Sequence, residues 1–387
     1  MTELRQARIH LDHINGAPLL PEVRSAMAEV LDRLANPSGL HAEGRIAAQA
    51  RDAARAQVAA LIGTRSEEVV FTSCGTEANV WALTHLAEAR RDRGRQVVLS
   101  SVEHLSLLQT ARRMEKEGWR VTLLPVDRRG RVDPAALDRV LTSETVLVSV
   151  QWANAEVGTL QPMEEIARRA KSRGVLVHSD AVAAAGQVPV DLRKIPVDAV
   201  SLAAHPMGGP PGIGALVLRK GTRIAPWFLG GGQEEGRRAG TENLLGVVGM
   251  GRAAEVVLKE REGWAGRITP LRDRLIRGIL DRVPEATLHG HPTERLPGHA
   301  SFSIPGTDAE ELVLALDMQA VAVGIGSACT SGARKASHVL KAMGVEESCA
   351  MGAVTCTLGG RTSQAEVDRV VDLFPRVAAR LKEGRVR

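Results

Sequence analysis

The sequence has few cysteines and no long apolar run. Its four cysteines, Cys74, Cys329, Cys349 and Cys356, are scattered along 387 residues and form no CxxC pair. A set this sparse cannot build a disulfide framework, so we expect free thiols. No apolar run approaches the roughly 18 residues that span a bilayer, and the N-terminal MTELRQARIHLDH lacks the apolar core of a signal peptide. These absences predict a cytoplasmic protein without a membrane segment.

The sequence also lacks a basic tail, although its formal net charge is +5. Its basic residues are spread along expected helices, as in AEARRDRGR and IARRAKSR. Dispersed charge favours a solvated surface, and an acidic partner such as tRNA stays open as an alternative. A composition of 44% hydrophobic and 25% charged residues is ordinary for a folded protein. The length allows one large α/β domain and a smaller one.

The stretch from residue 174 to 216 carries three apolar runs of strand length. The first ends at Asp180, the second is Ala199–Ala203, and the third starts at Ile213. Such runs, with polar or glycine-rich ends, are typical of a covered parallel sheet. Because ligands bind beyond the carboxyl ends of parallel strands, we expect Asp180 and His205 to line one site.

Two further strand ends carry candidate binding groups. A strand over Val69–Thr72 leads through small residues into a helix expected near Thr76. Free N–H groups at such a helix start attract anions, so Gly75 and Thr76 are expected to hold a phosphate. His104 follows the strand QVVLSS, where a histidine is more often a surface or capping residue.

Taken together, these motifs resemble the cysteine desulfurases of the NifS/IscS type, in the class V aminotransferase group of pyridoxal-phosphate enzymes. The resemblance covers nearly the whole chain and implies an α/β fold of the PLP-dependent transferase type (fold type I) with a mainly parallel sheet. It implies a large cofactor-type domain over residues 15–260. A smaller α+β domain is expected from residues 1–14 and 261–387.

The resemblance implies a cofactor site for pyridoxal phosphate. Asp180 matches the residue that holds the pyridinium nitrogen, and His104 matches the one that stacks on the ring. Thr241, in GGGQEEGRRAGTEN, matches a threonine that reaches the phosphate in the neighbouring subunit, which implies a homodimer. The complete set of expected cofactor-binding residues is Gly75, Thr76, His104, Asn154, Asp180, His205 and Thr241.

The lysine that forms the Schiff base in that family is missing here. The family's Ser-x-His-Lys turn corresponds to Ala203-Ala204-His205-Pro206, and proline has no amine to form an imine. The chain has only eight lysines, of which Lys335 lies nearest to the cysteine loop in sequence. Pyridoxal phosphate is therefore expected to bind non-covalently at best. Groups near its phenolic oxygen and the substrate are also replaced, by Ala155, Ala183 and Thr355.

The segment Val323–Gly344, VGIGSACTSGARKASHVLKAMG, resembles the family's loop whose cysteine carries sulfur as a persulfide. Cys329 is the predicted catalytic residue, on a loop that glycine and serine make mobile and exposed. Cys356 is expected in the core and Cys349 on a loop. No metal site is predicted, because the cysteine spacing supports neither a metal nor an iron–sulfur cluster.

Local patterns predict the small domain in outline. Strands are expected near 286–288 and 300–304, after a long helical stretch over 241–282. Capping boxes at Thr307–Glu310 and Ser363–Glu366 predict the starts of two helices.

Three functions stay open from the sequence. The first is sulfur trafficking, in which Cys329 takes persulfide sulfur from a donor protein and passes it to an acceptor. The second is a repurposed enzyme that binds non-covalent pyridoxal phosphate or another anionic ligand. The third is a non-catalytic scaffold or regulatory relative of an active desulfurase.

Overall fold

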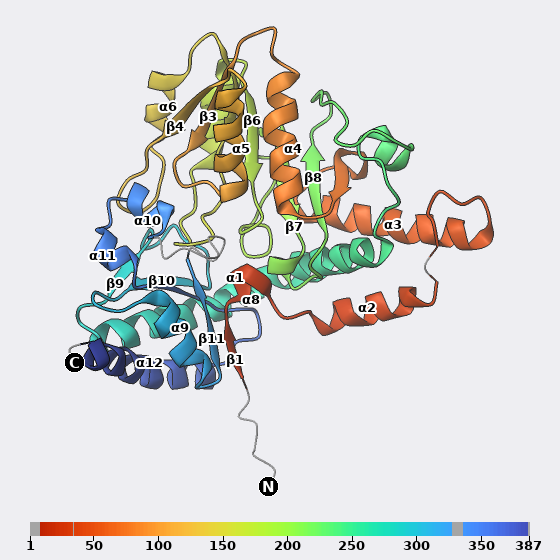
Figure 1. The fold of residues 1–387 in the computed structure, drawn as a ribbon. Helices are drawn as coiled ribbons and strands as arrows, with labels where there is room; N and C mark the ends of the chain where they lie inside the picture. Colours follow the sequence, from red (N-terminus) through yellow and green to blue (C-terminus); the bar gives the residue numbers. More distant parts are fainter. Residues whose placement is uncertain (1–7, 34, 327–335, 386–387) are drawn as a thin grey trace.

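The computed structural model describes residues 8–33, 35–326 and 336–385. Two β-sheets and their helices lie one above the other in Figure 1, and a long helix passes between them. The predicted α/β class with a mainly parallel sheet is confirmed. Among the described residues, no helix is long and apolar enough to cross a membrane.

The larger sheet has seven strands in the order β2-β8-β7-β6-β5-β3-β4. Every strand runs in one direction except β8, which is antiparallel to both neighbours. The third apolar run therefore forms a strand as predicted but reverses the expected direction. The bounds are β2 (Val69–Thr72), β3 (Gln96–Ser100), β4 (Arg120–Leu124), β5 (Thr145–Ser149), β6 (Leu176–Asp180), β7 (Ala199–Ala203) and β8 (Gly214–Leu218).

Helices cover both faces of this sheet, which explains why its central strands are apolar on both sides. One face packs on α4 (Gly75–Glu88) and α5 (Leu105–Lys116) in a buried cluster around Trp81 and Leu107. The other face packs on helices α3 (Ala42–Leu61), α6 (Pro134–Val140), α7 (Met163–Ser172) and the first half of α8 (Leu244–Arg282). Short helices α1 (His13–Gly16) and α2 (Pro21–Leu31) precede them, and three 3-10 turns are η1 (Ser66–Glu68), η2 (His205–Met207) and η3 (Gln233–Gly236).

The smaller sheet has five strands in the order β1-β11-β12-β10-β9 and has its own buried core around Phe302 and Phe374. Its first strand comes from the N-terminus, as the sequence predicted. The bounds are β1 (Ile9–Leu11), β9 (Thr287–His289), β10 (His299–Ser303), β11 (Val321–Ile325) and β12 (Ala353–Thr357), with helices α9 (Ala309–Asp317), α10 (His338–Ala342), α11 (Glu347–Ala350) and α12 (Gln364–Arg385).

The helix α8 joins the two bodies. It has 39 residues, and its first half packs in the core of the larger sheet while its second half packs in that of the smaller one. Trp264 lies between these halves and packs against both cores. The helix runs without a break across residue 260, and the division into domains at that residue stays a prediction.

The predictions for two helix caps and two cysteines are partly confirmed. The Ser363–Glu366 capping box forms, with Ser363 N donating to Glu366 Oε2 at 2.7 Å. The box at Thr307–Glu310 was wrong, because Asp308 caps α9 by accepting from the backbone N–H of Glu310 at 2.9 Å. Cys356 is fully buried as expected, whereas Cys349 lies in α11 and not in a loop.

Candidate active site

The carboxyl ends of the parallel strands gather the candidate residues. Asp180 is the last residue of β6, His205 begins η2 just after β7, and His104 caps α5 shortly after β3. Burial lowers the pKa of His205, and the charge of His104 acts in the same direction. The edge predicted from strand order therefore holds this group of side chains.

A chain of hydrogen bonds connects His104 with Asp180. His104 Nδ1 lies 2.7 Å from Ser106 Oγ and accepts from the backbone N–H of Ser106 at 3.1 Å. Because a backbone N–H can only donate, Nδ1 carries a lone pair and the ring proton of neutral His104 lies on Nε2. Asn79 Nδ2 donates to Ser106 Oγ at 3.0 Å and to Asp180 Oδ2 at 2.7 Å. The ring of His104 is thereby held in one tautomer and orientation.

Asp180 is held by donors on both oxygens. Its Oδ2 accepts from Asn79, and its Oδ1 accepts from the backbone N–H of Val182 at 2.9 Å. The carboxylate is buried, yet each oxygen keeps a further lone pair. Such a carboxylate is suited to hold a cationic ring N–H group in front of it.

The neighbouring Glu103 is a buried acid that the sequence reasoning overlooked. Burial, with a smaller contribution from the charge of Asp180, raises its pKa to about 8, against hydrogen bonds from Ser100 and from the backbone of Gln151. Both donors reach Oε1, while Oε2 is buried without a partner among the described residues. The carboxyl is therefore protonated at neutral pH. Its position next to His104 at a strand end was the available signal.

The helix α4 begins at Gly75, where the sequence predicted a helix start, and its role as an anion cradle stays a prediction. The helix starts at Gly75, with Cys74 as its N-cap residue, so the N–H groups of the first turn point toward the carboxyl edge of the sheet. A Cβ on Gly75 would lie 2.7 Å from Val182 Cγ2, so only glycine fits there. Val182 lies in the turn after Asp180, so the start of α4 packs against the same turn that holds Asp180.

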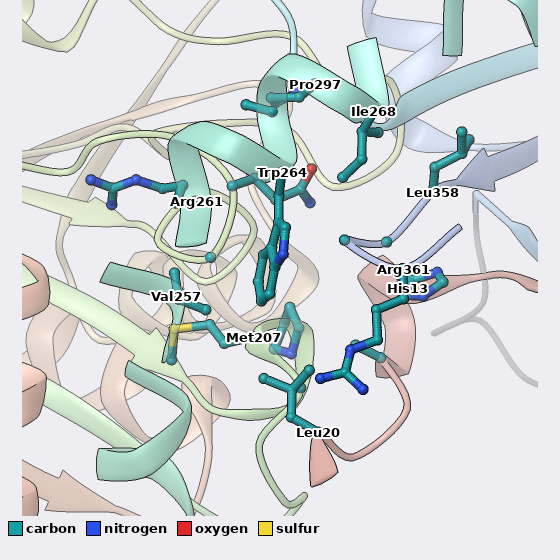
Figure 2. Close-up of a pocket in the computed structure, with 18 of the residues that line it drawn as sticks. His13, Leu20, Met207, Val257, Arg261, Trp264, Ile268, Pro297, Leu358 and Arg361 are labelled. Atoms are coloured by element: carbon teal, nitrogen blue, oxygen red, sulfur yellow. The ribbon is translucent and has the colours of Figure 1, made fainter. Parts of the chain in front are cut away.

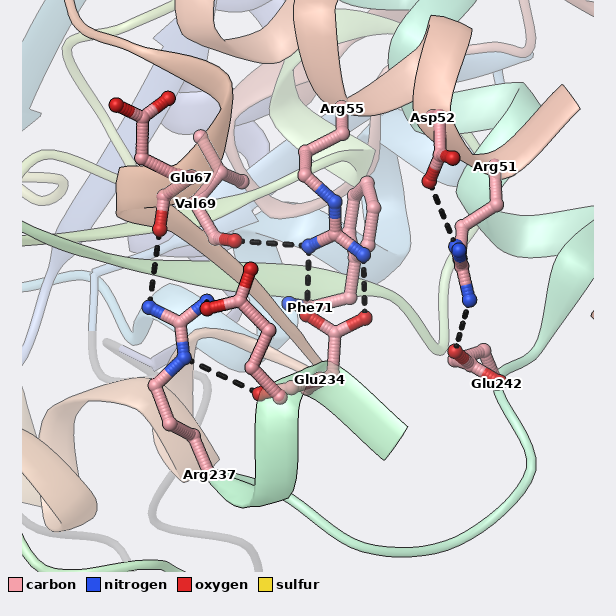
Figure 3. Close-up of polar contacts among 10 residues, drawn as sticks. Arg51, Asp52, Arg55, Glu67, Val69, Phe71, Glu234, Arg237 and Glu242 are labelled. Carbon is pink, nitrogen blue, oxygen red and sulfur yellow. Dashed lines mark hydrogen bonds and ion pairs between the residues drawn. The ribbon is translucent and has the colours of Figure 1, made fainter. Parts of the chain in front are cut away.

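The segment from residue 230 to 243 is held by ion pairs to α3, as Figure 3 shows for Glu234 and Glu242. Arg55 binds both carboxylate oxygens of Glu234 at 2.6 and 2.7 Å, and Glu234 also accepts from the backbone N–H of Phe71 at 3.0 Å. Arg51 contacts Glu242 at 2.9 Å, next to the exposed Thr241. These contacts position Thr241 on the surface.

A separate ion pair connects this segment to the cradle helix. Arg238 Nε donates to Glu77 Oε1 at 3.0 Å, and Glu77 accepts from the backbone N–H of Ser73 at 2.7 Å. Glu234 and Glu235 adopt left-handed backbone angles (φ 50° and 57°), which are rare for residues other than glycine. The surrounding ion pairs hold this strained turn in place.

The side chain of Asn154 forms hydrogen bonds with the surrounding backbone. Its Nδ2 donates to the Val102 carbonyl at 3.1 Å, and its Oδ1 accepts from the N–H groups of Glu156 and Val157, each at 2.8 Å. The residue shapes the turn after β5. Its expected contact with a cofactor stays a prediction.

Pro206 occupies the second position of η2, between His205 and Met207. Of the seven lysines in the described part of the chain, three form ion pairs elsewhere, namely Lys171, Lys341 and Lys382. The other four are exposed side chains on helices and turns: Lys116, Lys194, Lys220 and Lys259. Lys116 lies at the end of α5 opposite to His104. The side chain of Pro206 itself carries no amine.

The described residues on either side of the cysteine loop contact this edge of the larger sheet. Cys329 and Lys335 lie outside the described residues, but both ends of the loop are described. At one end, a Cβ on Gly326 would lie 2.5 Å from Glu156 Cγ. At the other end, His338 Nε2 lies 3.0 Å from the carbonyl oxygen of Glu103, and the charge of His104 contributes to lowering the His338 pKa. Both ends therefore meet the carboxyl edge of the larger sheet.

Glu156 is a second buried acid at this junction. Burial raises its pKa to about 7, and a hydrogen bond from Ser337 acts in the opposite direction. Its Oε1 is buried without a partner among the described residues. Ser337 directly precedes His338, so this acid lies between the two ends of the loop.

Known proteins resemble the chain over almost its full length. The family model described as aminotransferase class-V matches residues 9–370. A cysteine desulfurase IscS of Dictyoglomus turgidum is 40% identical over 375 residues, which cover 97% of this chain and 95% of the relative. A cysteine desulfurase of Cereibacter sphaeroides is 43% identical over 378 residues, covering 97% of both chains.

Solved structures agree with this relationship. A structure titled NifS-like protein has a TM-score of 0.91 and 33% identity, and the match covers 97% of this chain and 100% of that one. A NifS-like protein from Rickettsia africae has a TM-score of 0.87 and 28% identity, covering 96% and 99% of the two chains. The chain therefore belongs to the class-V aminotransferase family, as a cysteine desulfurase-like member.

Proposed function

We propose that this protein is a sulfur carrier of the cysteine desulfurase fold, which receives sulfur on Cys329 from a donor and passes it to an acceptor. The observation that carries the proposal is the docking of both loop ends, through Gly326 and His338, at the edge where His104 and Asp180 lie. Cys329 lies outside the described residues, between these two ends in the sequence.

The transfer needs no oxidant or reductant. The Cys329 thiolate attacks the terminal sulfur of a donor persulfide, a new S–S bond forms at Cys329, and the S–S bond of the donor breaks. The donor leaves as a thiolate and takes up a proton, and a second attack by an acceptor thiolate repeats the step. His338 lies close to one end of the loop, and burial lowers its pKa. The attacking species is the thiolate, whose proton is released to solvent.

The residues present fit only part of pyridoxal phosphate. The start of α4 suits its phosphate, the face of His104 suits its ring, and Asp180 suits a ring N–H group. When bound, the cofactor supplies an electron sink for amino-acid chemistry. Pro206 offers no amine for covalent attachment, so in this proposal the cofactor binds reversibly and Cys329 acts without it.

A second candidate function is reversible binding of a phosphate-bearing ligand at the same edge. The continuous hydrogen-bond chain from His104 to Asp180 favours it, because it keeps a ring platform and an acid ordered although the amine is lost. Equilibrium dialysis with pyridoxal phosphate, using wild type and Asp180→Asn, tests this candidate. Binding that weakens in the variant supports it, and absent binding rejects it.

We further propose a homodimer in the cytoplasm. Large apolar side chains are exposed on α3, on the loop before it and on the 225–243 segment, with Leu40 at 91% and Leu229 at 90%. Arg51 and Arg55 of α3 bind Glu242 and Glu234, so these elements are neighbours on one side of the molecule (Figures 1 and 3). An exposed apolar patch of this kind suits burial against a second copy. Protein partners donate or accept the sulfur, and tRNA stays an alternative acceptor.

Persulfide labelling tests the carrier function. The reduced full chain is mixed with glutathione persulfide, and peptides are analysed by mass spectrometry for one added sulfur. We expect labelling of Cys329 in the wild type and in the matched control Cys349→Ser, and its loss in Cys329→Ser. Cys356 should stay unlabelled, because burial raises its pKa to about 12. Labelling spread equally over Cys74, Cys329 and Cys349 would reject a dedicated carrier cysteine.

A further inference from the structure

Basic side chains gather at the edge of the larger sheet where its parallel strands begin. The reversed strand β8 ends at this amino edge, because Leu218 at its end pairs with Ala199 at the start of β7. Figure 1 shows the edge at the top of the molecule, where α4 also ends. Central strands of five residues separate it from the carboxyl edge by roughly 15 Å. The basic row consists of Arg90, Arg93, Arg95, Arg173, Arg219 and Lys220.

The carboxyl edge has a different chemistry. Figure 2 shows a mainly apolar cavity there, with Trp264 near Met207 and Leu20. Pro206 belongs to the lining of this cavity, and no member of the basic row does. The basic row is therefore separate from both the cavity and the candidate active site.

The turn from residue 90 to 95, between α4 and β3, forms one end of the basic row. Its sequence RRDRGR has four arginines and a single aspartate. Arg93 donates from Nη2 to the carbonyl oxygen of Arg173 at 2.5 Å, and from Nη1 to that of Gly174. These bonds fix the turn beside Arg173, just after α7, so that arginines from two segments adjoin.

Further contacts continue the basic row across the sheet. Lys171, in the last turn of α7, pairs with Asp198 at 2.7 Å. The carbonyl oxygen of Asp198 accepts from the backbone N–H of Arg219 at 2.9 Å, directly after β8. From β3 to β8 the row crosses five strands about 4.8 Å apart, so it extends over roughly 20 Å.

A hollow of about 560 Å³ lies at the β8 end of the basic row. Arg219 and Lys220 line it, and the one carboxylate of its lining, Glu68, is already bound. Glu68 Oε1 accepts from the backbone N–H of Lys220 at 2.6 Å, and Oε2 accepts from that of Arg65 at 3.1 Å. The hollow therefore keeps cationic side chains that this acid does not use.

Nearby acids do not balance the charge of the basic row. Asp191 binds Arg193 of the hollow through two contacts at 2.9 Å, and Glu67 lies 3.8 Å from Arg65. No member of the basic row itself has a carboxylate within ion-pair distance among the described residues. Cations repeated along one edge attract a polyanion.

The basic row has no aromatic platform. No aromatic residue lines the hollow or belongs to the 90–95 turn, and the chain has no tyrosine. Proteins that bind single-stranded nucleic acid stack its bases on aromatic side chains, whereas a duplex presents its phosphates to basic residues. Arginines without aromatic neighbours thus favour the backbone of a duplex.

We propose that the basic row binds the phosphate backbone of a double-stranded nucleic acid, without reading its base sequence. A length of roughly 20 Å spans about six base pairs. A duplex bound here lies on the edge opposite to the candidate active site. The proposal therefore goes beyond sulfur transfer and does not make the nucleic acid a sulfur acceptor.

Fluorescence anisotropy of the full chain with labelled duplexes of about 20 base pairs tests the proposal. The probes are an RNA duplex, a DNA duplex of the same sequence, and a scrambled version of each. We expect binding that scrambling does not change, with a slope of log affinity against log salt concentration of about −4, as for four to five phosphate contacts. The tighter duplex identifies the nucleic acid. No binding to either, or binding insensitive to salt, would overturn the proposal.

Two triple variants with the same change in net charge locate the surface. The first reverses exposed charges of the basic row, in Arg95→Glu, Arg173→Glu and Lys220→Glu. The matched control reverses exposed charges on α8 and α12 beside the smaller sheet, in Arg267→Glu, Arg277→Glu and Arg380→Glu. The first should weaken duplex binding by at least about 10-fold and flatten the salt slope by about 3, and the control should bind as wild type does. Equal losses in both would contradict the assigned surface.

The same variants separate this proposal from the carrier function. All six substituted side chains are exposed, so both variants should keep the thermal unfolding midpoint of wild type. The basic-row variant should still be labelled on Cys329 by glutathione persulfide, and Cys329→Ser should still bind the duplex. Loss of duplex binding in Cys329→Ser would contradict a surface that is independent of the cysteine loop.

Discussion

At the scale of single residues, buried acids define how this protein responds to pH. Glu103 and Glu156 have pKa values raised by burial to about 8 and about 7, against an ordinary value of 4.5. Between pH 4.5 and these raised pKa values, the folded state holds protons that the unfolded state releases. The free energy of unfolding therefore falls as pH rises through this range. Buried histidines act in the opposite direction, but only below their ordinary pKa of 6.5, as with His178 (about 3) and His299 (about 4).

The pH dependence of stability therefore tests whether the pKa of Glu103 is raised in the folded protein. Above pH 6.5, where the histidines no longer contribute, stability should fall toward pH 8 by at most about 1.4 kcal/mol per pH unit for each acid. Glu103→Gln mimics the protonated carboxyl and should flatten this decline, whereas the exposed Glu115→Gln should leave it unchanged. Urea unfolding across this pH range measures the slope. An identical slope in Glu103→Gln would mean that the acid is ionised in the folded protein.

A second residue-scale prediction concerns Pro206. Pro206→Lys places an amine after His205, at the position of the family's lysine, and should allow covalent attachment of pyridoxal phosphate. Borohydride reduction followed by mass spectrometry should find the added mass at residue 206 in the variant and nowhere in the wild type. Wild type that is modified at another lysine would show that a different amine has taken over the role.

At the scale of elements, the 230–243 segment depends on one buried ion pair. The Glu234 side chain is 1% exposed and is shared by Arg55 and the backbone N–H of Phe71. Glu234→Ala leaves Arg55 and that N–H unpaired and should lower the free energy of unfolding by about 3–5 kcal/mol. Glu88→Ala removes an exposed pair with Arg91 and should cost less than about 1 kcal/mol. Equal costs, measured by denaturant unfolding, would contradict the structural role of Glu234.

The sequence predicted individual strands and helix starts better than the contacts between them. Apolar runs and strand-end residues are local signals, so the strands and the helix start at Gly75 were predicted. The direction of β8, the capping of α9 by Asp308 and the raised pKa of Glu103 were not. Each of these depends on what packs nearby, such as the partner strands of β8 or the burial around Glu103, and residue spacing does not encode it.

At the scale of the whole molecule, the exposed apolar side chains predict assembly. Leu229→Asp places a charge at the centre of the proposed dimer surface and should shift the protein from dimer to monomer. Met318→Asp alters a similarly exposed side chain just after α9, at the smaller sheet, and should leave the dimer intact. Sedimentation velocity distinguishes the two. A monomeric wild type would contradict the proposed dimer.

The proposed carrier role concerns the whole molecule as well. The described residues have the fold of the family, while the turn after β7 carries Pro206. In the proposed function this combination would separate carrying sulfur from releasing it from cysteine, because only the release requires an amine.

The most direct test compares two sulfur sources on the same reduced protein. Cys329 is examined by mass spectrometry after reaction with glutathione persulfide, and in parallel after reaction with free cysteine and added pyridoxal phosphate. The account predicts a persulfide on Cys329 from the first source and none from the second. Persulfide on Cys329 or released sulfide from free cysteine would contradict it and would show a desulfurase that works without the lysine.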